Sequence, residues 1–87
     1  DLVVEVASTT LETDCDIKSP LYATAGFPEY WIVNLRDQTL EVRRDIQPNS
    51  QARGGFNYAS IQTLGRGQTV SPLALPNAQI AVADLLP

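Results

Sequence analysis

The chain has 87 residues, which is enough for one small domain with a modest core and too few for a second domain. Ten acidic and six basic side chains give a net charge of −4, which argues against strong nonspecific attraction to a phosphate backbone. The chain contains no histidine, and this excludes the Ser-His-Asp and Cys-His hydrolase schemes within it. The metal chemistry that remains uses oxygen ligands, which suit magnesium, manganese or calcium.

A single cysteine and the lack of long apolar runs bear on where the protein works. Cys15 has no partner for an internal disulfide, and no apolar run approaches the roughly 18 residues that cross a bilayer. We therefore expect a cytoplasmic protein without a membrane partner. Because the chain begins with Asp1 and contains no methionine, we also expect a fragment whose missing N-terminal part completes any site.

The first predicted element is a strand over residues 2–7, which holds one acid among branched apolar side chains. Its nearly continuous apolar character predicts a strand that is covered on both faces. An ionised Glu5 would be costly there without a cation or a metal ion beside it. The alternative is that Glu5 lies near the strand end, with its carboxylate in water.

A helix is predicted next, because apolar side chains recur at every fourth position in Ile17, Leu21 and Ala25. Thr13 or Asp14 is placed to cap its start, and Gly26 and Pro28 are placed to end it. Pro20 is tolerated only in the first turn of a helix. We therefore expect either a regular helix that starts near residues 17–19 or a kink at Pro20.

Extended segments alternate with turns through the rest of the chain. Residues 29–35 have strong β character, and residues 39–44 alternate apolar and charged side chains, as a half-exposed antiparallel strand does. Residues 47–55 predict a loop, and residues 56–64 predict a strand whose buried face the pattern leaves open. Short extended pieces at 69–70 and 79–82 and a last helical turn at 83–86 complete the prediction.

The order of these elements indicates the fold class. A strand, a helix and a second strand form the βαβ pattern, and antiparallel strands follow it. The sequence therefore predicts an α/β fold in which a mixed β-sheet packs against a helix, within a single domain over residues 1–87. A fold of this class does not by itself specify a function.

Three consecutive segments resemble one known family. Its core strand, its following helix and its next strand are similar to Asp1-Leu2-Val3-Val4-Glu5-Val6, to Asp14-Cys15-Asp16-Ile17-Lys18 with Leu21-Tyr22-Ala23, and to Ala25-Gly26-Phe27-Pro28-Glu29-Tyr30-Trp31-Ile32-Val33. The family is the bacterial putative restriction endonuclease family of the PD-(D/E)XK nuclease-like superfamily. The resemblance continues through residues 39–44 and 64–73, and it implies that the chain is the C-terminal portion of a restriction-endonuclease-like domain.

The resemblance implies a metal-dependent endonuclease that hydrolyses phosphodiester bonds of DNA with Mg²⁺ or Mn²⁺. The family motif has an Asp on one strand and Glu-x-Lys on the next, whereas Glu5-Val6-Ala7 has Ala in place of the Lys. The resemblance therefore assigns the Lys role to Lys18 on the helix. In that scheme Glu5 and the Val6 carbonyl hold the ion, and Lys18 orients the attacking water.

The second acid of the metal site is expected upstream of the chain. Asp1 and Glu5 are four positions apart on one strand, about 13 Å at roughly 3.3 Å per residue, so they cannot easily hold one ion together. Asp1 is therefore a candidate supporting ligand at the strand start. Asp14 precedes Lys18 by four residues and is interpreted as a helix cap or an ion-pair partner.

Structural interpretations accompany the functional ones. We expect Tyr22 and Trp31 in the core, where the Trp31 indole N–H needs a buried acceptor. Scattered arginines are interpreted as an ordinary solvated surface: Arg43, Arg44, Arg53 and Arg66. An alternative to the nuclease is a noncatalytic interaction module in which a hairpin of residues 30–33 and 40–42 pairs with a second copy to form a homodimer. A third interpretation is an inactive remnant with the same fold.

Overall fold

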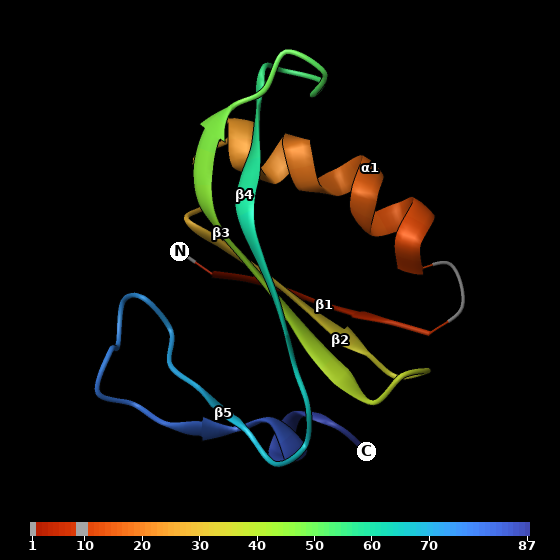
Figure 1. The fold of residues 1–87 in the computed structure, drawn as a ribbon, viewed down its shortest axis with the longest axis vertical. Helices are drawn as coiled ribbons and strands as arrows, with labels where there is room; N and C mark the ends of the chain where they lie inside the picture. The colour runs from red at the N-terminus through yellow and green to blue at the C-terminus, as the bar shows by residue number, and fades with distance from the viewer. Residues whose placement is uncertain (1, 9–10) are drawn as a thin grey trace.

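The computed structural model describes residues 2–8 and 11–87, and the side chains of residues 11–14 lie outside that description. The elements follow in the order β1 (Leu2–Ala7), α1 (Leu11–Thr24), β2 (Glu29–Asn34), β3 (Thr39–Pro48), β4 (Phe56–Leu64), β5 (Thr69–Val70), β6 (Ile80–Ala81) and the 3-10 helix η1 (Val82–Leu85). One mixed sheet has the strand order β1-β2-β3-β4, and β5 pairs separately with β6. Figure 1 shows α1 over the upper part of this sheet and the C-terminal segment below it.

β1, α1 and β2 form the predicted strand–helix–strand unit. β1 runs parallel to β2, with Glu5 in register with Ile32, whereas β3 is antiparallel to both β2 and β4. Two parallel strands need a crossover connection, and α1 supplies it. The predicted α/β class, a mixed sheet with one packed helix, is therefore confirmed.

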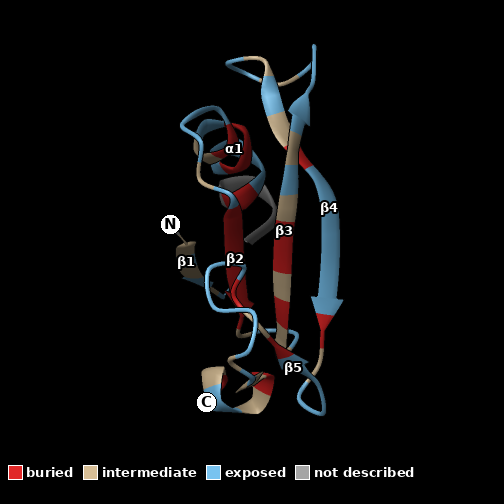
Figure 2. Ribbon diagram, turned by 90° about the vertical axis from the view of Figure 1, so that its left-hand side faces the viewer, coloured by how far each residue is buried: buried red, intermediate tan, exposed pale blue. Residues whose placement is uncertain are grey.

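β2, and not β1, is the strand that is covered on both faces. All six residues of β2 are buried, as Figure 2 shows, because β2 lies between β1 and β3 and a hydrophobic core covers each of its faces. β1 is an outer strand of the described sheet, and its Val4 and Val6 side chains are exposed. The prediction that residues 2–7 are covered on both faces is therefore wrong, and Glu5 lies at the rim of the sheet.

Each face of the sheet carries its own hydrophobic core, because successive strand residues point to opposite faces. Tyr30 and Ile32 of β2 point toward α1, and their core is completed by Cys15, Ala23 and Tyr58. Trp31 and Val33 point to the other face, where the core also contains Leu40, Val42, Leu64, Val70, Val82 and Leu86. The C-terminal segment of β5, β6 and η1 thus covers the face that α1 leaves open.

α1 starts earlier than the sequence predicts. It begins at Leu11, so the expected capping residues Thr13 and Asp14 lie inside the helix. It also runs through Pro20 to Thr24, which shows that a start near residues 17–19 is wrong. Because proline has no N–H, residue 20 donates no hydrogen bond to the carbonyl four residues before it.

The C-terminus of α1 ends as predicted. Gly26 has a φ of 88°, a left-handed conformation that glycine adopts without steric cost. The Gly26 N–H donates to the Ala23 carbonyl at 3.0 Å, and the Phe27 N–H donates to the Tyr22 carbonyl at 3.1 Å. This pair of bonds is the Schellman motif, which satisfies the last carbonyls of the helix and turns the chain into β2.

The remaining strands fall close to their predicted places, with one consequence for self-association. β3 extends the predicted strand to Pro48, and β4 spans the predicted residues 56–64. β2 and β3 each have two neighbours in the sheet, so the hairpin proposed to pair with a second copy offers no free edge.

The described part of the chain has no helix long and apolar enough to cross a membrane.

Candidate functional site: a carboxylate held by two tyrosines and a lysine

Glu5 projects from the middle of β1 toward α1. Side chains two positions apart share a face of a strand, and the neighbours Val3 and Ala7 pack into the core on the α1 side. α1 crosses this face, so side chains of the helix meet those of β1 and β2. The Glu5 side chain is 20% exposed. It therefore lies where a charged group contacts both protein and water.

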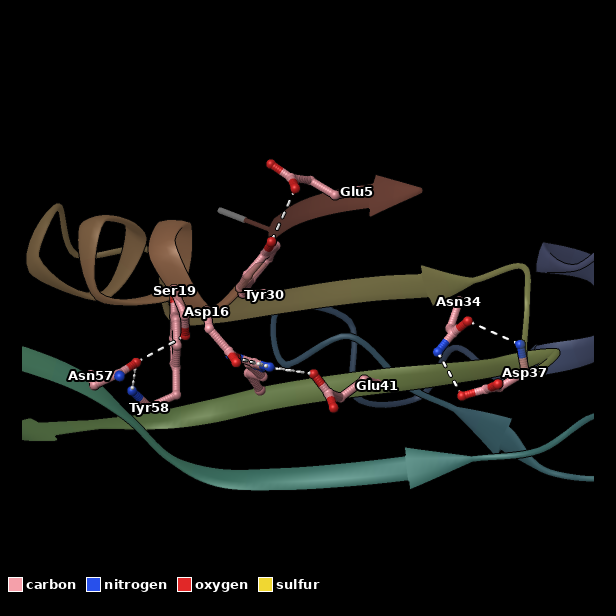
Figure 3. Close-up of polar contacts among 10 residues, drawn as sticks. Glu5, Asp16, Ser19, Tyr30, Asn34, Asp37, Glu41, Asn57 and Tyr58 are labelled. Carbon is pink, nitrogen blue, oxygen red and sulfur yellow. Dashed lines mark hydrogen bonds and ion pairs between the residues drawn. The ribbon is translucent and has the colours of Figure 1, made fainter. Parts of the chain in front are cut away.

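Three side chains donate hydrogen bonds to the Glu5 carboxylate. The Tyr22 hydroxyl donates to Oε1 at 2.6 Å, and the Tyr30 hydroxyl donates to Oε2 at 3.0 Å. Figure 3 shows the Tyr30 contact reaching from β2 to β1. The Lys18 ammonium donates to both oxygens, at 3.3 Å and 3.4 Å. The carboxylate is thus the common acceptor of donors from α1 and β2.

The helical spacing explains the donors from α1, and the strand register explains the donor from β2. Lys18 and Tyr22 are four residues apart and lie on one side of α1. Tyr30 is in register with Val3, two residues before Glu5, so its ring lies on the same face as Glu5. A long phenol then reaches the carboxylate diagonally across the two strands.

The three donors keep Glu5 ionised. Burial by itself would raise the pKa of Glu5, but hydrogen bonds from Tyr22, Tyr30 and Lys18 outweigh it and lower that pKa. The pKa of Tyr22 is raised, chiefly because its hydroxyl donates to the Glu5 carboxylate. The pKa of Tyr30 is raised by burial first and then by its neighbours Cys15 and Glu5. Both phenols therefore remain protonated donors at neutral pH.

An aromatic cluster holds the two phenols in place. The Tyr22 and Tyr30 rings lie 4.9 Å apart in an edge arrangement, and Phe27 meets Tyr22 at 5.9 Å. Tyr58 meets the Tyr30 ring at 6.3 Å, and its own hydroxyl donates to the Phe27 carbonyl at 2.6 Å. Burial raises the pKa of Tyr58 to about 12. The cluster joins α1, β2 and β4 beneath the Glu5 carboxylate.

A second polar network lies on the same face of the sheet, on β3. The Arg43 guanidinium donates to the Glu41 carboxylate at 2.7 Å and to Asp16 of α1 at 3.2 Å; Figure 3 shows both acids converging there. The guanidinium also stands 6.0 Å from the Tyr30 ring centre. A cavity of about 330 Å³ opens beside these residues, and neither Glu5 nor Lys18 lines it.

A third network lies on the opposite face, where Glu29 is fully buried. Its carboxylate accepts hydrogen bonds from the Trp31 indole at 2.9 Å, from Arg44 at 2.7 Å and from the Leu73 N–H at 2.7 Å. The expected buried acceptor for Trp31 is therefore Glu29. This network attaches the C-terminal segment to β2 and β3, and its central Glu29 carboxylate is closed to solvent.

A comparison with family models identifies the family of the chain. The model of Uma2, described as putative restriction endonuclease, matches residues 1–83. The chain belongs to the Uma2 family. No curated protein matches it.

The Uma2 assignment confirms the resemblance to the putative restriction endonuclease family, and the structure shows where the predicted site residues lie. Glu5 and Lys18 come from different elements and meet, at 3.3 Å. Asp1 lies outside the described residues, so its expected role stays a prediction. Asp14 is inside α1 and does not cap it, and because its side chain lies outside the described residues, its ion pair with Lys18 stays a prediction. The Ala7 carbonyl accepts from the Leu35 N–H at 2.9 Å, and because carbonyls alternate along a strand, the Val6 carbonyl points away from β2.

The described residues offer a divalent metal ion one carboxylate. Residues 2–8 and 11–87 contain no group of three His, Cys, Asp or Glu side chains placed to hold a metal ion, as far as their side chains are described. Mg²⁺ is often bound by one or two carboxylates, several waters and substrate phosphates. Ionised Glu5 fits that role, provided that the ion takes the position that Lys18 occupies on the carboxylate. The Val6 carbonyl is the other predicted oxygen ligand.

Sequence analysis missed the two tyrosines of this site. Tyr22 was expected in the core, and Tyr30 was interpreted as part of an aromatic strand. The available signal was the four-residue spacing of Lys18 and Tyr22, which places both on one side of a helix. The contribution of Tyr30 depends on the register of β1 with β2, which no local pattern specifies.

Proposed function

We propose that this Uma2 family chain carries the carboxylate and lysine of a metal-dependent endonuclease that hydrolyses phosphodiester bonds of DNA. The observation that carries the proposal is the contact between Glu5 and Lys18 on the α1 side of β1. An ionised acid and an ammonium, held together at the rim of a sheet, are the groups that metal-assisted phosphate hydrolysis uses. Family membership supports nuclease chemistry.

Lys18 is the mobile member of the pair. Its side chain is 48% exposed, and its contacts to Glu5 are longer than the roughly 2.7–2.9 Å of a strong charge-assisted bond. An ammonium on a flexible four-carbon stem can leave the carboxylate and reach a phosphate oxygen or a water. There it orients the attacking water and offsets the negative charge that develops on the phosphate.

Glu5 and the Val6 carbonyl are the proposed ligands of Mg²⁺ or Mn²⁺. The lowered pKa of Glu5 keeps its carboxylate charged at neutral pH, as a metal ligand must be. When bound, such an ion polarises the phosphate and lowers the pKa of a coordinated water. The net charge of −4 means that DNA is held by local contacts near this site and not by a general basic surface.

The proposal predicts that Lys18→Ala, made in the intact protein, leaves the fold in place and abolishes Mg²⁺-dependent cleavage of DNA. Lys18 is the only lysine of the chain, so the substitution removes one defined ammonium. Glu5→Gln should abolish cleavage as well, because the amide is a poor ligand for the ion. Cleavage of a plasmid with and without EDTA measures the effect, and circular dichroism checks the fold.

Arg53→Ala is the matched control, since it removes one exposed positive charge from the loop between β3 and β4. Its cleavage rate should stay within about twofold of the unsubstituted protein. Unchanged cleavage by Lys18→Ala would reject the role of Lys18. Cleavage that survives EDTA would reject the metal.

Self-association is the second candidate function, and one observation favours it. Val4 and Val6 are 48% and 65% exposed on β1, an outer strand of the described sheet. Exposed apolar side chains beside an unpaired strand edge favour pairing with another chain. Light scattering over a range of protein concentrations tests this: a mass that rises with concentration in the absence of any Mg²⁺ response supports the interaction module.

A further inference from the structure

We propose that Tyr22 and Tyr30 are positioning residues that hold the Glu5 carboxylate in one orientation, while Lys18 is the partner that exchanges. The inference rests on the proposed function, because the exchange matters only if the carboxylate receives an ion. It assigns separate tasks to groups that contact the same two oxygens.

The fixed partners differ from the exchanging one in burial. Tyr30 has no exposed surface, and its ring packs between the Tyr22 and Tyr58 rings. Tyr22 is half-buried and is held from two sides by the Phe27 and Tyr30 rings. A phenol fixed in this way loses little further freedom when its hydroxyl meets the carboxylate, because its ring is already immobile.

The contact distances agree with this division. The Tyr22 hydroxyl approaches Oε1 to 2.6 Å, within the range of a charge-assisted O–H···O bond, and the Tyr30 hydroxyl approaches Oε2 to 3.0 Å. Lys18 contacts both oxygens only at 3.3 Å and 3.4 Å. A half-exposed ammonium at these distances contributes little to stability and is easily replaced by water.

The arrangement leaves half of the carboxylate open to exchange. An ionised carboxylate has two oxygens with two lone pairs each. One phenol engages each oxygen, so the remaining lone pairs are those that Lys18 contacts. A divalent ion that takes the place of Lys18 therefore finds a carboxylate that is already oriented and charged.

The groups that face Glu5 from both packed elements support the same conclusion. From α1 these are Lys18, Tyr22 and the more distant Cys15, and from β2 the group is Tyr30. Burial raises the pKa of the Cys15 thiol, which keeps it neutral at neutral pH. Removing a phenol hydroxyl leaves the carboxylate with one fixed partner fewer, so the Glu5 side chain gains rotational freedom.

The test compares Tyr22→Phe, Tyr30→Phe and Tyr58→Phe in the intact protein. Tyr58 belongs to the same aromatic cluster, but its hydroxyl donates to the Phe27 carbonyl and not to Glu5, which makes it the matched control. The mobility of the Glu5 side chain is measured by NMR relaxation of its Cγ methylene group, with Glu5→Gln to assign its signal. Mg²⁺ alone is then titrated against each variant.

We expect Tyr22→Phe and Tyr30→Phe to make the Glu5 side chain more mobile and to weaken Mg²⁺ binding about 10–100-fold. Tyr58→Phe should leave the Glu5 mobility and the Mg²⁺ affinity unchanged, whatever it does to thermal stability. A Glu5 side chain that stays as ordered in both site variants as in the unsubstituted protein overturns the inference. If the unsubstituted protein cleaves no DNA, the proposed function fails, and the NMR relaxation of Glu5 still decides whether the tyrosines position the carboxylate.

Discussion

Two glutamates of this small sheet have different surroundings. The Glu29 side chain is 3% exposed and meets donors that the fold holds in place. The Glu5 side chain is 20% exposed and shares its oxygens with a half-exposed ammonium. The Glu29 carboxylate attaches the C-terminal segment to the sheet, whereas the exposure of the Lys18 ammonium supports the metal role proposed for Glu5.

Glu29→Gln should destabilise the chain by about 3–5 kcal/mol, because it leaves Arg44 partly buried without its counter-charge and places amide hydrogens against a donor N–H. Urea unfolding monitored by far-UV circular dichroism gives the free energy of unfolding. Trp31 fluorescence should change as well, since its indole loses a charged acceptor. Asp84→Asn, at an exposed site, is the control and should cost less than about 0.5 kcal/mol. A cost for Glu29→Gln as small as that of the control would show that the buried pair contributes nothing.

Trp31 and Tyr22 show how far residue-level prediction reaches. The need of Trp31 for a buried acceptor follows from indole chemistry, and Glu29 lies two residues away on the same face of β2. The hydroxyl of Tyr22 on α1 has an equal need, but its acceptor is 17 residues away on the strand β1. The sequence alone predicts that a buried polar group needs a hydrogen-bond partner. Only the tertiary structure identifies that partner. Trp31 faces away from Glu5, so its fluorescence is a poor reporter of events at the site.

At the scale of the element, β1 and β2 show why the sequence alone does not identify the strand that is covered on both faces. Residues 2–7 and 29–34 both read as apolar strands of a parallel pair, and nothing within either segment states which has a neighbour on its far side. β3 provides that neighbour for β2 by a tight hairpin, in which Asn34 and Asp37 bond each other through side chain and backbone. Element type and order were therefore predictable, whereas the position within the sheet was not.

α1 tolerates Pro20 because packing offsets part of the local cost. A proline inside a helix costs about 3 kcal/mol, whereas the buried ring and the stiffer unfolded chain return about 1–2 kcal/mol. Pro20→Ala should therefore stabilise the chain by about 1–2 kcal/mol, since it restores an N–H donor for the Asp16 carbonyl. The free energy of unfolding in urea measures the change.

Pro28→Ala is the control for this prediction, because Pro28 is exposed and lies outside the helix. It should destabilise the chain by about 0.4–1 kcal/mol through the added freedom of the unfolded state. A loss of stability in Pro20→Ala would show that the ring contributes more to packing than it costs the helix.

At the scale of the whole molecule, most of the positive charge already has a partner. Ion pairs within the described residues join Lys18 to Glu5, Arg36 to Asp37, Arg43 to Asp16 and Glu41, and Arg44 to Glu29. The sequence interpretation of the arginines as solvated surface is thus wrong for Arg43, whose side chain is 9% exposed. Buried pairs cannot turn outward to phosphates without leaving an uncompensated acid. Lys18 is the cation at the site whose release costs least.

This distribution predicts a specific salt dependence for DNA binding by the intact protein. Each phosphate contact contributes about −0.9 to the slope of log K against log salt on B-DNA. If Lys18 leaves Glu5 to contact a phosphate, Lys18→Ala should reduce the magnitude of that slope by about 0.9. Arg53→Ala, in the exposed loop between β3 and β4, should leave the slope unchanged. Fluorescence anisotropy with a labelled duplex in Ca²⁺, over a range of salt concentrations, measures both slopes. Equal slopes for the unsubstituted protein and Lys18→Ala would mean that the ammonium stays on the carboxylate when DNA binds, because an ammonium that reached the phosphate would release a counterion.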